Sequence, residues 1–433
     1  VLRALFAKIY SPFTAKRHFF SFAFTRFCER DGKKILITKN TPSAVQERRN
    51  DSNELRFFCV AHTGGSHPDT LLRLYETYVR SILDYGSFVY FPKNAGLKTK
   101  LERIQFAAIR TALGYRRSTP TNILLAEAKI SSVEERAGML GRKYVARALC
   151  NDNLEMTIAA KEFYQSHKSG RRPSGCLSRC IFSVLGDEYR IQSRERFDPY
   201  NNSYSTLMYS AVLNVSLGQD IKSSPAPNRL LNEYIEARKA TPIYTDGSKV
   251  KGAPSVGYAV YCPRDEYRSS GSLSPISSIF TAECCAIIGA LEHIALTDGE
   301  RFMIVSDSLS ALLGVGSLRT RSDTMEQTLE IKRRIAALSS GIRGKEIELL
   351  WIPSHIGLES NEEVDALARS ATLREHPRVS FVRYSDLAAE FSKVARNNTE
   401  AKNKMDGQEK GRTYFELFHN DRAAPWFSGS GLS

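Results

Sequence analysis

The segment from residue 241 to 372 constrains the fold most, because short apolar runs alternate there with amphipathic ones. Runs rich in β-branched and aromatic residues at 242–250 and 255–262, with Gly252 and Pro254 between them, predict a β-hairpin. The elements expected after it are a strand at 267–275, a helix at 280–296, a strand at 301–308, helices at 308–316 and 323–340, a strand at 346–355 and a helix at 361–371. This order predicts an α/β fold with a mixed five-stranded sheet and flanking helices.

Acidic residues fall at the ends of these expected elements. Asp246 lies in the first strand, Asp307 ends the fourth, and Asp365 lies on the last helix. Glu283 opens the first helix, for which Thr281 is the expected N-cap. Singly, each acid has an ordinary explanation as a turn or helix-end residue. Together they are harder to explain that way, because gathered carboxylates repel one another unless a cation lies among them.

Oxygen-only ligands favour Mg²⁺ or Mn²⁺ over zinc. Two such ions about 4 Å apart can activate a water and stabilise the leaving oxygen of a phosphodiester. Four acids at element ends around one sheet would supply the oxygen ligands of such ions.

Four short motifs carry a resemblance to a known family. They are YTDGS at 244–248, TAE at 281–283, SDS at 306–308 and WIPSHIGLESNEEVDALA at 351–368. In these residue types and in their order, the segment resembles a type I ribonuclease H domain of the form carried by non-LTR retrotransposons. The resemblance implies an endonuclease that hydrolyses the RNA strand of RNA–DNA hybrids and leaves 3′-hydroxyl and 5′-phosphate ends.

The resemblance also implies roles for individual residues. The metal-binding and catalytic acids of the family fall on Asp246, Glu283, Asp307 and Asp365, which are expected to bind two Mg²⁺ ions, with Mn²⁺ as a substitute. Asp246 would bridge both ions, with Glu283 and Asp307 on one and Asp365 on the other. The alternative is a catalytically silent nucleic-acid-binding fragment of a decayed element, which the loss of any of these acids would favour.

The loop before the last helix is expected to be catalytic as well. The family's loop histidine falls on His355, where an imidazole near a reacting water can shuttle protons. Asn361 and Ser248 fall on positions expected to hold substrate. An integrase-like or exonuclease relative of the same fold is disfavoured, because the Ser354–His355 loop and its ten-residue spacing to Asp365 suit ribonuclease H.

Charge is distributed unevenly along the chain, whose net charge is +14. Residues 1–240 carry 38 basic and 22 acidic side chains, a balance of +16, whereas residues 241–372 carry 13 basic and 17 acidic, a balance of −4. A basic first half suits a polyanionic partner, and nucleic acid is the expected one. Protein partners are not indicated by any motif.

The basic half carries a second resemblance. Residues 69–92 and 101–130 are helical by periodicity and resemble the segment after the fingers and palm of the reverse transcriptase in the same retrotransposons. The paired-Asp motif of a polymerase is absent upstream, so no DNA synthesis is expected. The expected apolar positions are Leu71, Leu74, Tyr75, Tyr78, Ile82, Ile104, Ala108, Thr111 and Ala112, and the basic ones are Arg103, Arg110, Arg116 and Arg117.

These observations divide the chain into five parts. They are a basic, Phe-rich leader without a motif at 1–54, a helical reverse transcriptase remnant at 55–180, a linker at 181–240, the ribonuclease H domain at 241–372 and a tail at 373–433 with a helix at 385–404. The first residue is Val1 rather than Met, which suggests a fragment.

Eight scattered cysteines indicate a reducing, intracellular location, cytoplasmic or nuclear. Cys176 and Cys180 lie near His167, but their spacing fits no zinc pattern well, which favours free thiols. The longest apolar run near a helix, 284–291, is short, so no membrane-spanning segment is expected.

Overall fold

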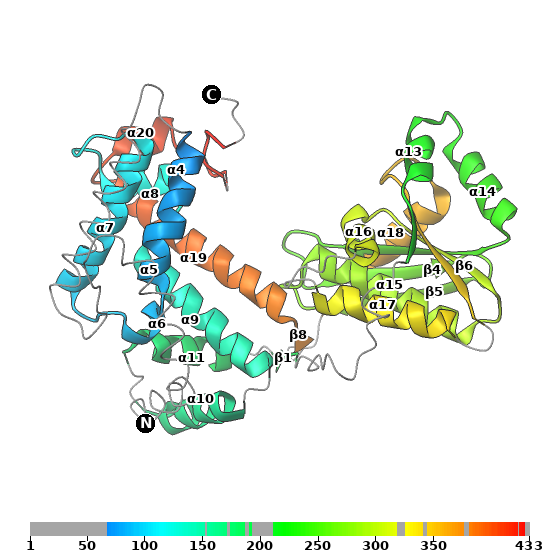
Figure 1. Ribbon diagram of the computed structural model, residues 1–433, viewed down its shortest axis with the longest axis horizontal. Helices are drawn as coiled ribbons and strands as arrows, with labels where there is room; N and C mark the ends of the chain where they lie inside the picture. The colour runs from blue at the N-terminus through cyan, green and yellow to red at the C-terminus, as the bar shows by residue number, and fades with distance from the viewer. Residues whose placement is uncertain are drawn as a thin grey trace, which may run out of the picture. The chain divides into compact units, whose positions relative to one another are not determined.

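The chain divides into two compact units. The computed structural model describes residues 67–151, 154–170, 174–186, 190–192, 211–317, 325–340, 344–375, 381–422 and 424–428, and the leader expected at 1–54 lies outside them. One unit is Val1–Asp187 with Ala388–Ser433, and the second is Glu188–Leu387. The first is mainly helical and the second contains the sheets (Figure 1).

The second unit is built on a mixed sheet with the strand order β2-β7-β6-β3-β4-β5. Its strands are β2 (Val212–Asn214), β3 (Thr241–Ser248), β4 (Val256–Cys262), β5 (Tyr267–Leu273), β6 (Arg301–Ser306) and β7 (Glu346–Trp351). β3, β4 and β5 pair antiparallel, whereas β2, β7, β6 and β3 pair parallel. The predicted α/β class with a mixed sheet is confirmed.

The expected number of five strands is wrong, because β2 adds a sixth. β2 pairs parallel with β7 from Val212↔Glu348 to Asn214↔Leu350. The stretch interpreted as a linker also forms α13 (Ser216–Ser223) and α14 (Pro227–Arg238). A three-residue strand has no recognisable period of its own, so only its pairing with β7 defines it.

Helices cover both faces of this sheet. On one face, α15 (Ile279–Leu296), α16 (Leu309–Gly316) and α17 (Met325–Ser339) pack on alternate strand residues such as Ile243 and Ile304. On the other, α13, α14 and α18 (Glu359–Ala371) pack on the residues in between, such as Tyr244 and Val305. Both faces of the central strands are therefore buried, as the apolar runs of β3 and β6 require.

The cap of α15 differs from the prediction. Ser278, not Thr281, is the N-cap, and its hydroxyl accepts a hydrogen bond from the Thr281 backbone N–H at 3.1 Å. Thr281 is instead within the first turn, and its hydroxyl donates to the Asp386 carboxylate at 2.9 Å. Both residues are good cap formers, and tertiary contact with Asp386 decides between them.

α15 is also the one helix in the described part of the chain that is long and apolar enough to cross a membrane. Its apolar run in the sequence is short because Glu283 and Glu292 interrupt it. Half of the helix is buried inside the fold, and it packs on β3 and β4. Its apolar character is therefore explained by burial in the core of this unit.

The first unit is a group of helices. They are α4 (Pro68–Leu74), η2 (Tyr75–Arg80), α5 (Ser81–Asp84), α6 (Ser87–Tyr90), α7 (Ala95–Leu113), α8 (Thr121–Ala128), α9 (Val133–Cys150), α10 (Leu154–His167), α11 (Cys176–Gly186) and α20 (Arg412–Leu417).

The helix predicted at 385–404 is α19 (Tyr384–Gly407), and just before it β8 (Phe381–Val382) pairs with β1 (Arg190–Ile191). Cys176 and Cys180 are free and buried.

The predicted apolar stripe of this unit is wrong at Tyr78, which is 55% exposed. The buried side chains are Tyr75, Val79 and Leu83. Residues 75–80 form a π-helical turn, whose wider spacing places residues four apart on one face. The stripe therefore shifts by one residue, and a sequence period of 3.6 does not reveal this shift.

The four arginines predicted to form a basic side have two different environments. Arg103, Arg116 and Arg117 are exposed, whereas Arg110 donates a hydrogen bond to the Thr119 carbonyl at 2.9 Å. Three of the four guanidinium groups are thus open to a polyanion, and the fourth supports the end of α7.

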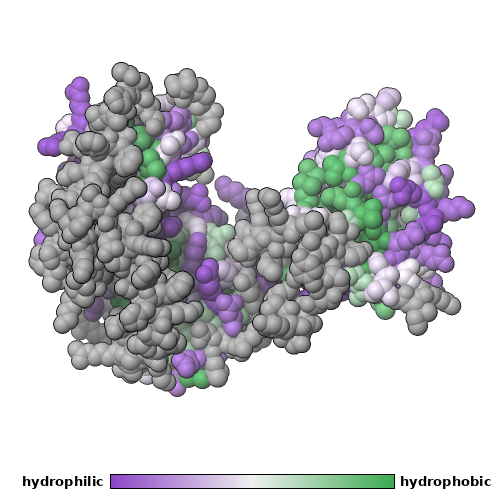
Figure 2. All heavy atoms as spheres, in the orientation of Figure 1, coloured by the Kyte–Doolittle hydropathy of each residue, from purple (hydrophilic) through white to green (hydrophobic). Residues whose placement is uncertain are grey.

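On the face of the second unit that Figure 2 shows, polar side chains surround one apolar area. Figure 2 shows apolar side chains gathered around α16. Leu313 on α16 is half exposed, and Val212 on the neighbouring β2 is also exposed. None of the four predicted metal-binding acids belongs to these two elements.

A fragment that begins at residue 238 is expected to be much less stable than one that begins at 211, both ending at 387. The shorter fragment lacks β2 and the buried Leu217, Ile221 and Leu231 of α13 and α14. Each buried side chain contributes about 1.5–3 kcal/mol, so the loss is roughly 5–9 kcal/mol, comparable with a whole domain's stability. Thermal unfolding of both fragments checks this, and equal unfolding temperatures would contradict it.

Candidate active site

Asp246 and Glu283 are brought together by the close packing of α15 on β3. Gly247 is the reason that this approach is possible. A Cβ at Gly247 would lie 2.8 Å from the backbone nitrogen of Glu283 and 3.0 Å from the Cβ of Ala282. Any side chain at this position would push α15 away. The glycine of the YTDGS motif therefore sets the distance between the first two carboxylates.

α18 approaches from the opposite face in the same way. A Cβ at Gly257 on β4 would lie 2.0 Å from the Ala368 carbonyl oxygen. Gly257 pairs with Ser248 at the end of β3. This close contact places the helix that carries Asp365 beside the strand that carries Asp246. The Asp365 carboxylate accepts a bond from the Arg369 guanidinium at 3.0 Å, one helical turn on.

Asp307 directly follows β6, and its backbone is fixed by β7. Its carbonyl oxygen accepts bonds from the Trp351 indole N–H at 3.1 Å and from the Leu309 backbone N–H at 3.0 Å. The end of β7 and the loop after it therefore lie next to Asp307. Trp351 belongs to the quoted motif, but its role as a support for Asp307 is not evident from the sequence.

His355 lies in that loop, exposed to solvent. Its backbone has φ 56°, in the left-handed region that few residues other than glycine adopt. Asn228 on α14 donates a bond to the Gly357 carbonyl at 2.9 Å, which attaches the loop to the body of the unit. Sequence reasoning missed Asn228, because a helix distant in the sequence supplies it.

The structure brings three of the four acids into one group. Ligand oxygens of Asp246, Glu283 and Asp307 all lie within 4.8 Å of one another. Asp365 is outside this group, but its charge raises the pKa of both Asp246 and Asp307, so it lies close by. Asp246 and Glu283 are each only 6% exposed. Three carboxyl groups from separate parts of the fold thus meet at one place, with Asp365 near enough to interact with two of them.

Two oxygens of the group lack hydrogen-bond partners. Among the described residues, Oδ2 of Asp246 and Oε2 of Glu283 are buried and accept no bond. Buried carboxylate oxygens are normally satisfied, because leaving them bare costs free energy. The oxygens that a hard cation prefers are therefore the ones left available here.

Burial and mutual repulsion dominate the electrostatics of the group. Burial, and then the charges of Asp307 and Asp365, raise the pKa of Asp246 to about 8. Burial, and then Asp246 and Asp307, raise the pKa of Glu283 to about 9. Burial also raises the pKa of Asp307, although the Ser354 hydroxyl and the His355 imidazole oppose the rise. Without a cation the group therefore retains protons at neutral pH.

The two expected substrate-binding residues lie on the elements that carry Asp246 and Asp365. Ser248 is half-buried at the end of β3, two residues from Asp246. Asn361 lies in the first turn of α18 and is buried, and its Oδ1 accepts no bond from the described residues. An amide oxygen held without a partner is available to an incoming donor.

The fold is a mixed α/β sheet flanked by helices, and the carboxyl groups of Asp246, Glu283 and Asp307 gather beside its central strands. Residues 238–372 match the family model described as RNase H, so this segment is similar to RNase H domains. The match lies within the second unit and contains the seven predicted site residues. No curated protein matches the chain.

The raised pKa values predict a pH-dependent stability difference between the metal-free chain and its Asp246→Asn variant. Above pH about 4 the unfolded carboxyl is ionised, whereas the folded one keeps its proton until about pH 8, so rising pH destabilises the parent. The amide of Asn at this position does not titrate, so it adds no charge to the buried group as pH rises. We expect the variant to gain in unfolding temperature over the parent as pH rises from 5 to 8 in chelator, and a constant difference would contradict this.

Proposed function

We propose that the second unit is a metal-dependent endonuclease that hydrolyses the RNA strand of RNA–DNA hybrids. The observation that supports this most is the meeting of Asp246, Glu283 and Asp307, two of them with a bare buried oxygen. The RNase H family match supports the same substrate class. The expected products carry 3′-hydroxyl and 5′-phosphate ends.

The residues present fit divalent cations. All the available donors are carboxylate oxygens, which suit Mg²⁺, with Mn²⁺ as a substitute. Asp246, Glu283 and Asp307 would hold one ion, and Asp246 with Asp365 a second. Such ions, when bound, activate a water and stabilise the leaving oxygen of a phosphodiester. Oδ2 of Asp365 is paired with Arg369, so a second ion would compete with that guanidinium for this oxygen.

The remaining side chains position the substrate and move protons. His355 is exposed beside Asp307, where a ring nitrogen can accept a proton from the attacking water or deliver one to the leaving oxygen. Asn361 Oδ1 can accept a bond from a ribose 2′-hydroxyl, a group that RNA has and DNA lacks. Ser248 would contact the neighbouring nucleic-acid backbone. The acids thus supply catalysis, and Asn361 with Ser248 supplies strand choice.

We further propose that the chain derives from a non-LTR retrotransposon polyprotein and acts inside the cell, in a reducing compartment. The motif resemblance and the six free cysteines of the described residues support this. The first unit would then be the remnant of the reverse transcriptase C-terminal region. The competing proposal is a fragment that binds nucleic acid without cutting it.

Cleavage of hybrid by the purified full chain separates the two proposals. The test uses an RNA–DNA hybrid labelled on either strand, with Mg²⁺, with Mn²⁺ and with chelator. Metal-dependent cutting of the RNA strand alone is expected, with double-stranded DNA left intact. Binding of hybrid without cleavage under any of these conditions would favour the silent fragment.

Binding is expected to depend mainly on residues outside the nuclease unit. Residues 211–387 carry 20 basic and 22 acidic side chains, whereas the full chain has a net charge of +14. Because log K falls with log salt in proportion to the phosphates neutralised, this fragment should bind hybrid more weakly and with a shallower salt slope. It should keep its preference for the RNA strand. Equal salt slopes for fragment and full chain would contradict this prediction.

A further inference from the structure

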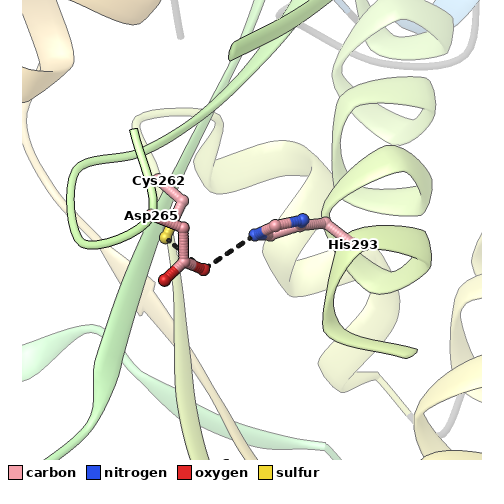
Figure 3. A group of neighbouring side chains, drawn as sticks. All are labelled: Cys262, Asp265 and His293. Atoms are coloured by element: carbon pink, nitrogen blue, oxygen red, sulfur yellow. Dashed lines mark hydrogen bonds and ion pairs between the residues drawn. The ribbon is translucent and has the colours of Figure 1, made fainter. Parts of the chain in front are cut away.

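A second group of metal-ligating side chains lies where the β4–β5 hairpin meets the end of α15. Cys262 is the last residue of β4, Asp265 lies in the turn before β5, and His293 lies in the last turn of α15. Figure 3 shows the Asp265 carboxylate between the thiol and the imidazole. The ring of Tyr267 stacks on His293 with centroids 3.9 Å apart and planes at 8°, which fixes the orientation of the imidazole.

The distances within this group match the edges of a zinc tetrahedron. Zinc bonds of about 2.3 Å to sulfur and about 2.0 Å to nitrogen or oxygen give edges of about 3.5 Å and about 3.3 Å. Sγ of Cys262 lies 3.6 Å from Oδ2 of Asp265, and that oxygen lies 3.2 Å from Nε2 of His293. The three ligand atoms are all within 4.8 Å of one another. Little movement is needed to place one ion between them.

The charges around the group leave it open to a cation. Arg264, next to Asp265 in the chain, directs its guanidinium to the Thr241 hydroxyl at 2.7 Å. Among the described residues, Asp265 pairs with no lysine or arginine. Burial, with the Asp265 charge adding to it, raises the pKa of Cys262, so the thiol is protonated while no ion is present. An incoming cation would displace that proton to solvent.

We propose that Cys262, Asp265 and His293 bind one zinc-class divalent transition-metal ion. Thiolate and imidazole donors select zinc over Mg²⁺, which takes oxygen ligands. Asp265 is exposed, so the fourth position is open to water. The bound ion links the hairpin to the helix that carries Glu283.

This site is separate from the carboxylate group and does not depend on the proposed function. His293 follows Glu283 by ten residues on α15, so the two lie about 15 Å apart along the helix axis. A third group, Glu400, His419 and Asp421 in the first unit, is weaker. There, Lys404 already pairs with Asp421 at 2.7 Å, so a cation must compete with a bound ammonium.

Titration of the metal-free full chain with Co²⁺ and Zn²⁺, in excess Mg²⁺ to occupy the carboxylate group, tests the proposal. We expect one equivalent of Co²⁺ to give a sulfur-to-cobalt charge-transfer absorption, which Zn²⁺ then abolishes. At a free Zn²⁺ concentration 100-fold above its Kd, the unfolding temperature should rise by about 5–10 °C.

Three variants distinguish this site from other thiols. Cys262→Ser should lose the absorption, and Cys284→Ser, a matched control at an equally buried cysteine on α15, should keep it. Because Cys262→Ser loses a buried thiol and could fail to fold, Asp265→Asn at the exposed turn provides a second arm and should weaken Zn²⁺ binding at least tenfold. Absence of the absorption in the parent, or unchanged Zn²⁺ affinity in Asp265→Asn, would show a hydrogen-bonded cluster only and overturn the proposal.

Discussion

Asp246→Asn should reduce hybrid cleavage by at least about 10³-fold while the chain stays folded. A cation supplies several kcal/mol of transition-state stabilisation, and each 1.36 kcal/mol is a factor of ten in rate. Ligand oxygens of Asp246 lie within 4.8 Å of those of Glu283 and Asp307. Burial raises the pKa of Asp246, and the charges of Asp307 and Asp365 raise it further, so this acid interacts with residues of both proposed ion sites. Initial rates on labelled hybrid at saturating Mg²⁺ measure the effect.

Two observations separate loss of chemistry from loss of structure. The metal-free variant should unfold at or above the temperature of the parent at pH 8, because one repelling charge has been removed from a buried group. Its stabilisation by added Mg²⁺ should be reduced. Asp298→Asn, in the exposed loop after α15, is the matched control and should cut at the parental rate. Parental activity in Asp246→Asn would show that the acids hold no catalytic ion.

The sequence predicted the central part of the fold because its apolar patterns match its secondary structure. Strands β3 and β6 are buried on both faces, so their apolar runs are strong signals, and the acids stand out where those runs end. Motif spacing then located the acids on the right elements. The geometry by which they meet was not predictable, since it depends on helix approach at Gly247 and Gly257.

The features that the sequence did not reveal depend on tertiary contacts. β2 is defined by its pairing with β7, and the shift at Tyr78 follows from a π-helical turn. The sequence shows that Arg369 lies one helical turn after Asp365. It does not show that the two side chains pair, as they do in the structure. Cys262 and His293 lie in no common motif, and only the packing of the hairpin against α15 brings them together.

His355→Ala should lower the cleavage rate by about 10²- to 10⁴-fold, which is the usual contribution of a positioned proton carrier. The loss should not exceed the one measured for Asp246→Asn under the same conditions, because no acid of the group is removed. His355 is exposed, and its influence on Asp307 is electrostatic, so binding of Mg²⁺ and hybrid should change little. Single-turnover rates, with separate measurement of hybrid affinity and of Mg²⁺-dependent stabilisation, check each part.

The backbone at His355 requires a matched variant, because alanine is strained at φ 56°. His355→Asn tolerates the left-handed conformation and also lacks an imidazole, so both variants should show the same loss if proton transfer is the cause. If His355→Ala loses activity and His355→Asn keeps it, His355 acts only through the conformation of the loop. Added imidazole should partly restore both variants, since the position is open to solvent and a free base can reach it. Loss of Mg²⁺-dependent stabilisation in both variants would instead make His355 a metal ligand, which the all-oxygen donor set beside it argues against.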